Sequence, residues 1–143
     1  MKSDDLQDII SNILNCRRFA VAGASRDTSK YGYLVYKTLK AAGYEVYPVN
    51  PNTDYVDGDR VYPELADCPE RPEVVVTVVQ PEITLEIVRN AGHLHIPYVW
   101  MQPGSESAKA VEEMDALGIQ GVHSGPCIMV AVHTHPQRQR GIS

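Results

Sequence analysis

The stretch 74–79, Val-Val-Val-Thr-Val-Val, is the clearest structural signal in this sequence. It is almost entirely β-branched, which is typical of a parallel strand whose sheet is covered on both faces. Further apolar runs at 18–23, 44–49, 97–101 and 119–123 predict four more strands. The chain therefore contains five candidate strands.

Helical patterns alternate with these strands. Apolar residues at i, i+3, i+4 spacing from Leu6 to Leu14 predict an N-terminal amphipathic helix. The same spacing predicts helices over 31–42, 81–91 and about 105–117, with Ser105 or Ser107 beginning the last. Strands that alternate with helices imply right-handed crossovers and a parallel sheet. We predict an α/β fold: a Rossmann-like, doubly wound domain with about five parallel strands and an extra N-terminal helix.

Length and composition narrow the class of protein. The 143 residues suit a single domain, with a core at about 15–130 and a C-terminal tail at 131–143. A formal charge of −5 makes nucleic acid a poor partner. No apolar run has the roughly 18–20 residues that span a membrane, and the first residues do not resemble a signal peptide. Three widely spaced cysteines fit a reducing compartment, so we expect a cytoplasmic protein.

Ligands of open parallel sheets bind beyond the carboxyl ends of the strands. Four segments follow predicted strands here: Gly23-Ala24-Ser25, Val49-Asn50-Pro51, Val79-Gln80-Pro81 and Met101-Gln102-Pro103-Gly104. The first is the most informative, because a glycine turn that leads into a helix offers backbone N–H groups to a phosphate. Arg26 and Lys30 add positive charge to the same loop. Glycine after a buried strand is also common for structural reasons alone, and both interpretations stay open.

The departures from known motifs limit the choice of nucleotide. The loop that starts at Gly23 is neither G-x-G-x-x-G nor a P-loop, since Lys30 is not placed as in G-x-x-x-x-G-K-[ST]. A nicotinamide enzyme carries an acidic residue at the end of its second strand, whereas this chain has Asn50. These features favour an adenine nucleotide that is not simply NAD. Tyr31 lies near the loop, where it either stacks on adenine or packs on the sheet.

Several of these segments together resemble the small stand-alone CoA-binding domain family. The first two are Phe19 to Ser25 and Tyr44 to Pro51. Gly58 and Tyr62 fit the G-x-x-x-Y stretch of that family, Trp100-Met101-Gln102-Pro103-Gly104 is similar to its W-x-Q-x-G segment, and Gly125-Pro126-Cys127-Ile128 resembles its C-terminal cysteine motif. The likeness covers roughly residues 15–130. Its specificity lies in the ordered combination, and Ser107 stands where the family most often has Asn.

This resemblance implies a Rossmann-like domain that binds coenzyme A or an acyl-CoA, related in fold to the CoA-binding domain of succinyl-CoA synthetase α subunits. By position, it implies that the pyrophosphate lies against Gly23, Ala24 and Ser25. The adenosine would lie by Asn50 and Pro51, and the adenine or pantetheine side would be lined by Val79, Gln80 and Pro81. The channel beyond would be lined by Gln102 and Gly104. Arg26 and Lys30 are our candidates for the 3′-phosphate, on charge alone. No catalytic residue is predicted, which favours a binding protein over an enzyme.

Three alternatives remain at this point. A small NAD(P)-dependent oxidoreductase is one, although no proton donor can be named for it. A metal or thiol enzyme built on Cys127 with His123, His133 and His135 is the second, although the last two histidines look solvated in a polar tail. The third concerns assembly: the N-terminal helix either packs on its own sheet or mediates a homodimer, and a chain that presents CoA could do so to a protein partner.

Overall fold

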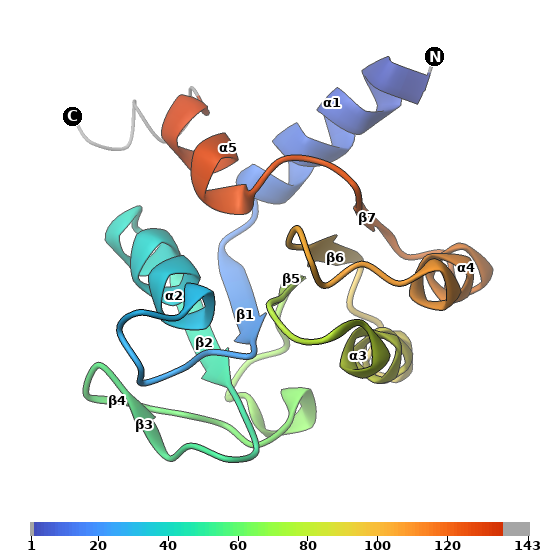
Figure 1. Cartoon of the computed structure of the whole chain (residues 1–143). Coiled ribbons are helices and arrows are strands. Elements are labelled where there is room, and N and C mark those ends of the chain that lie inside the picture. Colours follow the sequence, from blue (N-terminus) through green and yellow to red (C-terminus); the bar gives the residue numbers. More distant parts are fainter. Residues whose placement is uncertain (1, 136–143) are drawn as a thin grey trace.

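The structure, a computed structural model, describes residues 2–135 of the chain. Helices and strands alternate along it (Figure 1). Their order is α1 (Lys2–Leu14), β1 (Arg18–Ala22), α2 (Tyr31–Ala41), β2 (Glu45–Val49), β3 (Tyr55–Val56), β4 (Asp59–Arg60), the short 3₁₀ helix η1 (Leu65–Asp67), β5 (Val74–Thr77), α3 (Pro81–His93), β6 (Tyr98–Met101), α4 (Ala108–Leu117), β7 (Gln120–Val122) and α5 (Ile128–Thr134).

Five strands form one parallel sheet in the order β2-β1-β5-β6-β7. The chain goes from β1 through α2 to β2 on one side and later returns to β5 on the other side. The strand order therefore reverses between β1 and β5. Ala22 and Thr77, the last residues of these two strands, are register partners. The prediction of a five-stranded, parallel Rossmann-like sheet is confirmed.

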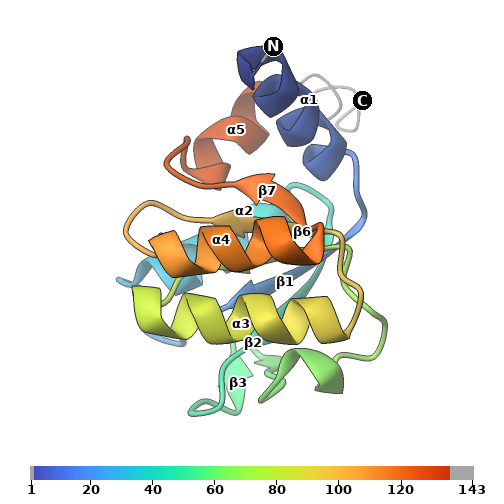
Figure 2. The ribbon, with the colours of Figure 1, turned by 90° about the vertical axis from the view of Figure 1, so that its right-hand side faces the viewer.

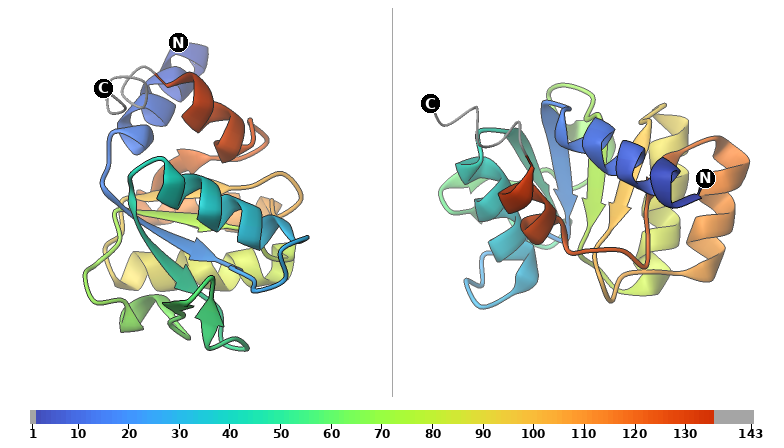
Figure 3. Two further views of the ribbon diagram at one scale, coloured as in Figure 1. Left: turned by 90° about the vertical axis from the view of Figure 1, so that its left-hand side faces the viewer. Right: turned by 90° about the horizontal axis from the view of Figure 1, so that it is seen from above.

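The sheet is covered on both faces, which explains the β-branched composition of β5. Val74 and Val76 pack into one core cluster with α1, α2 and α5. Val75 packs into the opposite cluster with α3, α4 and η1. Figures 2 and 3 show these two helical layers on either side of the strands. All three valines are fully buried.

The ends of the helices follow local chemistry. Ser107 begins α4, because its hydroxyl accepts a hydrogen bond from the Ala110 N–H at 3.2 Å. Gly118 ends α4 in the left-handed conformation, with φ of 72°. Pro81 occupies the first turn of α3 as predicted. No helix between residues 2 and 135 has the length and apolarity that a bilayer crossing requires.

Two parts of the fold differ from the sequence prediction. The strands β3 and β4 form an antiparallel hairpin that we did not predict, and its turn is Asp57-Gly58. Residues 131–135, which we predicted to begin a C-terminal tail, are instead folded: α5 runs to Thr134, and Val132 is 1% exposed. Burial of the apolar side of α5 against α1 and α2 stabilises this helix, and the remainder of the predicted tail, 136–143, lies outside the described residues.

Candidate functional site

The loop after β1 is held in a tight space between two neighbouring segments. Gly23 has φ of 100°, and a Cβ atom there would lie 2.2 Å from the carbonyl oxygen of Val78. On the other side, a Cβ atom on Gly32 would lie 2.0 Å from the carbonyl oxygen of Gly23. Two glycines therefore allow the first turn of α2 and the end of β5 to approach the same backbone.

Asn50 fixes the next peptide group of this loop. Its Nδ2 donates to the carbonyl oxygen of Ala24 at 2.8 Å, and its Oδ1 accepts from the Asn52 N–H at 2.8 Å. Because a trans peptide points its C=O and N–H in opposite directions, this contact also directs the N–H of Ser25 away from Asn50. The side chain predicted beside the adenosine thus contributes first to the shape of the loop.

The same loop presents several open hydrogen-bond donors. The N–H groups of Ala24, Ser25 and Arg26 have no acceptor within the described residues, and the same is true of Tyr31 and Gly32 in the first turn of α2. Unpaired N–H groups beside a helix N-terminus form a favourable place for an anion. The backbone here is chemically suited to a phosphate group.

The charged residues of the loop lie on its exposed side. Arg26 and Lys30 are exposed, and neither makes an ion pair within the described part of the chain. Asp27 accepts hydrogen bonds from the hydroxyl and the N–H of Ser29, and these bonds lower the pKa of its carboxyl group. Both cations therefore remain available beside the open N–H groups.

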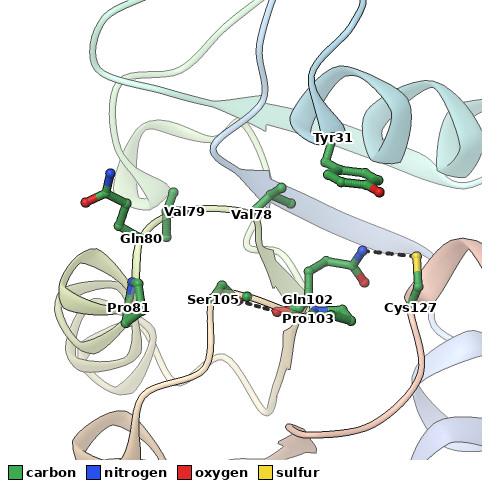
Figure 4. Close-up of a pocket in the computed structure, with 10 residues that line it drawn as sticks. Tyr31, Val78, Val79, Gln80, Pro81, Gln102, Pro103, Ser105 and Cys127 are labelled. Atoms are coloured by element: carbon green, nitrogen blue, oxygen red, sulfur yellow. Dashed lines mark hydrogen bonds between the residues drawn. The ribbon is translucent and has the colours of Figure 1, made fainter.

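A cavity of about 470 Å³ lies beyond the carboxyl ends of β5 and β6 (Figure 4). That size is within the usual range for small-molecule sites. Its walls come from the start of α2, from the segments after β5 and β6, and from the turn before α5. The lining residues are Tyr31, Val78, Val79, Gln80, Pro81, Gln102, Pro103, Gly104, Ser105 and Cys127.

Trp100 and Gln102 hold the segment before α5 against this cavity. The indole Nε1 of Trp100 donates to the carbonyl oxygen of Pro126 at 3.2 Å. The Oε1 of Gln102 accepts from the Ile128 N–H at 2.7 Å, and its Nε2 donates to the Sγ of Cys127 at 3.2 Å. These bonds give a physical reason for the pairing of a W-x-Q segment with a distant cysteine segment.

Ser105 forms the buried floor of the cavity. Its hydroxyl lies 2.8 Å from the Thr77 hydroxyl and donates to the carbonyl oxygen of Gln102 at 2.8 Å. Ser105 and Thr77 are 2% and 0% exposed, so these groups are already satisfied within the protein. They fix how the segment after β6 turns and leave the apolar walls to meet a ligand.

The structure brings together most of the predicted site residues, in two adjoining groups. Six of the predicted residues line the cavity: Tyr31, Val79, Gln80, Pro81, Gln102 and Gly104. Gly23, Ala24, Ser25 and Asn50 form the loop network next to Val78. Pro51 is exposed and outside the cavity lining, as are Arg26 and Lys30.

Some lining residues were absent from the predicted set. Val78, Pro103 and Ser105 are direct neighbours of predicted residues, and that adjacency was the available signal. Cys127 was considered for thiol or metal chemistry and was not assigned to the binding site. Gly32 was missed as well, although it lies at the start of the helix that the loop feeds.

The expectation of a solvated histidine pair near the C-terminus is half wrong. His133 is exposed, but His135 is 8% exposed, and its Nε2 lies 3.1 Å from the Oδ1 of Asn15. The turn of the chain back onto α1 is the reason. No group of three His, Cys, Asp or Glu side chains between residues 2 and 135 is placed to hold a metal ion.

Comparison with known proteins gives consistent likenesses. Acetate–CoA ligase (ADP-forming) II of Archaeoglobus fulgidus is 35% identical over 71 residues, which are 48% of this chain and 10% of that protein. The α subunit of acetate–CoA ligase (ADP-forming) II of Pyrococcus furiosus is 33% identical over 85 residues, which are 59% of this chain and 19% of that subunit. Among solved structures, a conserved hypothetical protein from Pyrococcus furiosus is 36% identical with a TM-score of 0.76, covering 80% of this chain and 98% of that one.

The chain thus spans about a tenth to a fifth of the length of the two ligases. A sequence model described as "CoA binding domain" matches residues 17–133, which include the glycine loop, the cavity walls and α5 up to its last residue but one. That match covers most of the chain and contains every site segment described above. This chain belongs to the CoA binding domain family.

Proposed function

We propose that this protein binds coenzyme A, with the pyrophosphate on the loop between β1 and α2 and the pantetheine arm in the cavity. The observation that carries the proposal is the loop around Gly23, where three consecutive N–H groups are open beside the cavity. An extended ligand with phosphates at one end and a long uncharged arm at the other matches this arrangement. The family match supports the same ligand.

The proposed role is that of a binding protein, in which the chain holds or presents CoA and turns over no substrate. The ligase relatives carry this unit within much longer chains. The cavity walls described here are consistent with a domain that only binds CoA. Most of the lining is apolar, and the hydroxyl of Ser105 and the Oε1 of Gln102 are already hydrogen-bonded within the protein.

The phosphate end is tested by a change of charge at constant shape. Ser25→Asp places a carboxylate beside the open N–H groups, and Ser25→Asn is the neutral control of nearly equal size. Each variant offers a side-chain oxygen in place of the hydroxyl that now accepts from the Asp27 N–H. Repulsion from a nearby like charge amounts to several kcal/mol at short range in a partly screened site. We expect calorimetric titration to show at least about a ten-fold weaker affinity for CoA in Ser25→Asp than in Ser25→Asn. Equal affinities in the two folded variants would exclude a phosphate from this loop.

The 3′-phosphate is tested separately with the exposed cations. We expect Arg26→Ala or Lys30→Ala to reduce the preference for CoA over its 3′-dephospho form. Arg71→Ala is the control, because Arg71 is exposed and lies before the amino-terminal end of the central strand β5, away from the carboxyl ends of the strands. If the preference for CoA over its 3′-dephospho form is unchanged in both loop variants, neither Arg26 nor Lys30 binds the 3′-phosphate. NAD belongs in the same titration, and tighter binding of NAD than of CoA would overturn the proposed function.

A further inference from the structure

One end of the cavity carries a thiol, supplied by Cys127. Figure 4 shows Cys127 on the wall across from Gln80 and Pro81, with its sulfur directed toward Gln102. Cys127 is partly buried and is not in a disulfide. A ligand that enters along the apolar walls of the segments after β5 and β6 therefore reaches a sulfur atom.

Gln102 offers a polar group to a ligand at the same end of the cavity. Its side chain is 4% exposed and lines the cavity. One Nε2 hydrogen goes to the Sγ of Cys127, and the Oε1 is used by the Ile128 N–H. The second Nε2 hydrogen has no acceptor within residues 2–135. The Nε2 atom is thus already hydrogen-bonded to Cys127, and its second hydrogen is left for an acceptor on a ligand.

The other two cysteines lie outside this cavity and differ in their surroundings. Cys16 follows α1, and its thiol donates to the carbonyl oxygen of Asn12 at 3.3 Å. Burial raises the pKa of Cys16 to about 11 and that of Cys68 to about 12. Because the thiolate is the nucleophile in disulfide exchange, both are poor competitors near neutral pH. They serve as internal controls.

We propose that Cys127 captures coenzyme A covalently, as a mixed disulfide formed by exchange with CoA disulfide. This inference rests on the proposed function, because the cavity must first hold the pantetheine arm. An amide carbonyl of that arm accepts the open Gln102 hydrogen, and its terminal sulfur meets the Sγ of Cys127.

The step is balanced without any further oxidant. The Cys127 thiolate attacks one sulfur of CoA disulfide, the sulfur–sulfur bond of that molecule breaks, and a bond between Cys127 and one CoA forms. The second CoA leaves as a thiolate and takes up the proton that Cys127 released. One disulfide is consumed and one is formed, so a second thiol reverses the reaction.

The test is incubation of the whole protein with CoA disulfide, followed by intact mass and peptide mapping. We expect one CoA adduct, located on Cys127 and removed by dithiothreitol. Cys16→Ser and Cys68→Ser should react like the parent, and Cys127→Ser should not react. Glutathione disulfide at the same concentration should react at least about ten-fold more slowly, because it lacks the groups that position the sulfur. Acetyl-CoA, which has no free thiol, should protect Cys127.

The outcomes separate this inference from the proposed function. An adduct spread over all three cysteines, or equal rates with glutathione disulfide, would overturn covalent capture. If Cys127→Ser and the parent bind CoA reversibly with similar affinity and no adduct forms on Cys127, capture fails while the proposed function stands. If neither binds CoA by calorimetry, the proposed function fails.

Discussion

Gly32 in the first turn of α2 lies directly against the backbone of Gly23. A Cβ atom on Gly32 would approach the Gly23 carbonyl oxygen to 2.0 Å, a distance that no real side chain tolerates. The β1 loop and α2 are therefore matched at the level of single atoms.

Gly32→Ala should weaken both stability and binding. Alanine favours a helix by about 1 kcal/mol over glycine, but overpacking against a rigid carbonyl typically costs about 1–3 kcal/mol. We expect a lower free energy of unfolding in urea and weaker CoA binding by calorimetry. Gly92→Ala in α3 is the matched control, since its Cβ would meet the flexible end of the Leu117 side chain. If the two variants are equally stable, the contact with Gly23 does not constrain the loop.

Asn50 should behave as a residue that positions the loop. In Asn50→Asp the donor to the Ala24 carbonyl oxygen is lost, and a carboxylate oxygen faces that carbonyl instead. Asn52→Asp is the control, because it makes the same amide-to-carboxylate change in an exposed side chain. Loss of one partner of such a bond costs about 1–3 kcal/mol. We expect urea unfolding and CoA titration to show losses for Asn50→Asp that greatly exceed those for Asn52→Asp. Similar behaviour of the two variants would contradict this role.

Gln102→Leu should loosen the segment before α5. The buried N–H of Ile128 then has no acceptor, at a cost of about 1–3 kcal/mol. Hydrogen exchange at the Ile128 amide measures this directly and should become faster than in the parent. Trp100→Phe removes the bond to Pro126 and part of a fully buried ring but leaves the acceptor of the Ile128 N–H in place, so it should affect the Ile128 amide more mildly. Unchanged protection of Ile128 in Gln102→Leu would show that packing alone holds α5.

Cys68 should make the protein less stable at high pH. Burial, reinforced by the neighbouring Asp67 carboxylate, raises the pKa of Cys68 from its ordinary 9.0 to about 12. The native state then keeps a proton that the unfolded state loses, so the free energy of unfolding falls as pH rises from about 9 toward 12. In Cys68→Ala the decrease between about pH 8 and about pH 10 should be smaller. An identical pH dependence in both proteins would assign the alkaline loss to other groups.

The main elements of this fold are predictable because each carries a local signal. The uninterrupted valines of β5 require two covered faces, and Gly118 and Pro81 mark helix ends by their own backbone preferences. The β3–β4 hairpin also had a local signal in Asp57-Gly58, a dipeptide suited to its tight turn, where φ is 53° and 81°. The flanking strands have only two residues each, which is too few for an apolar pattern to predict them.

The cavity was predictable only in part, because it depends on contacts between distant segments. The rule for parallel sheets places Val79 and Gln102 at the correct edge. The arrival of Cys127 beside Gln102 depends on how the chain crosses back over the sheet after β7, for which residue spacing gives no measure. The same is true of α5, whose burial depends on a surface formed by α1 and α2.

The indole of Trp100 has a practical consequence for optical measurements. It is the single tryptophan of the chain, it is fully buried, and its Nε1 is bonded to the carbonyl oxygen of Pro126, next to Cys127. Excitation of tryptophan therefore reports on one wall of the cavity with no background from a second indole. A molecule that displaces this segment changes the emission wavelength, and a disulfide at Cys127 places a quenching group nearby. The protein thus contains its own fluorescent probe of the site.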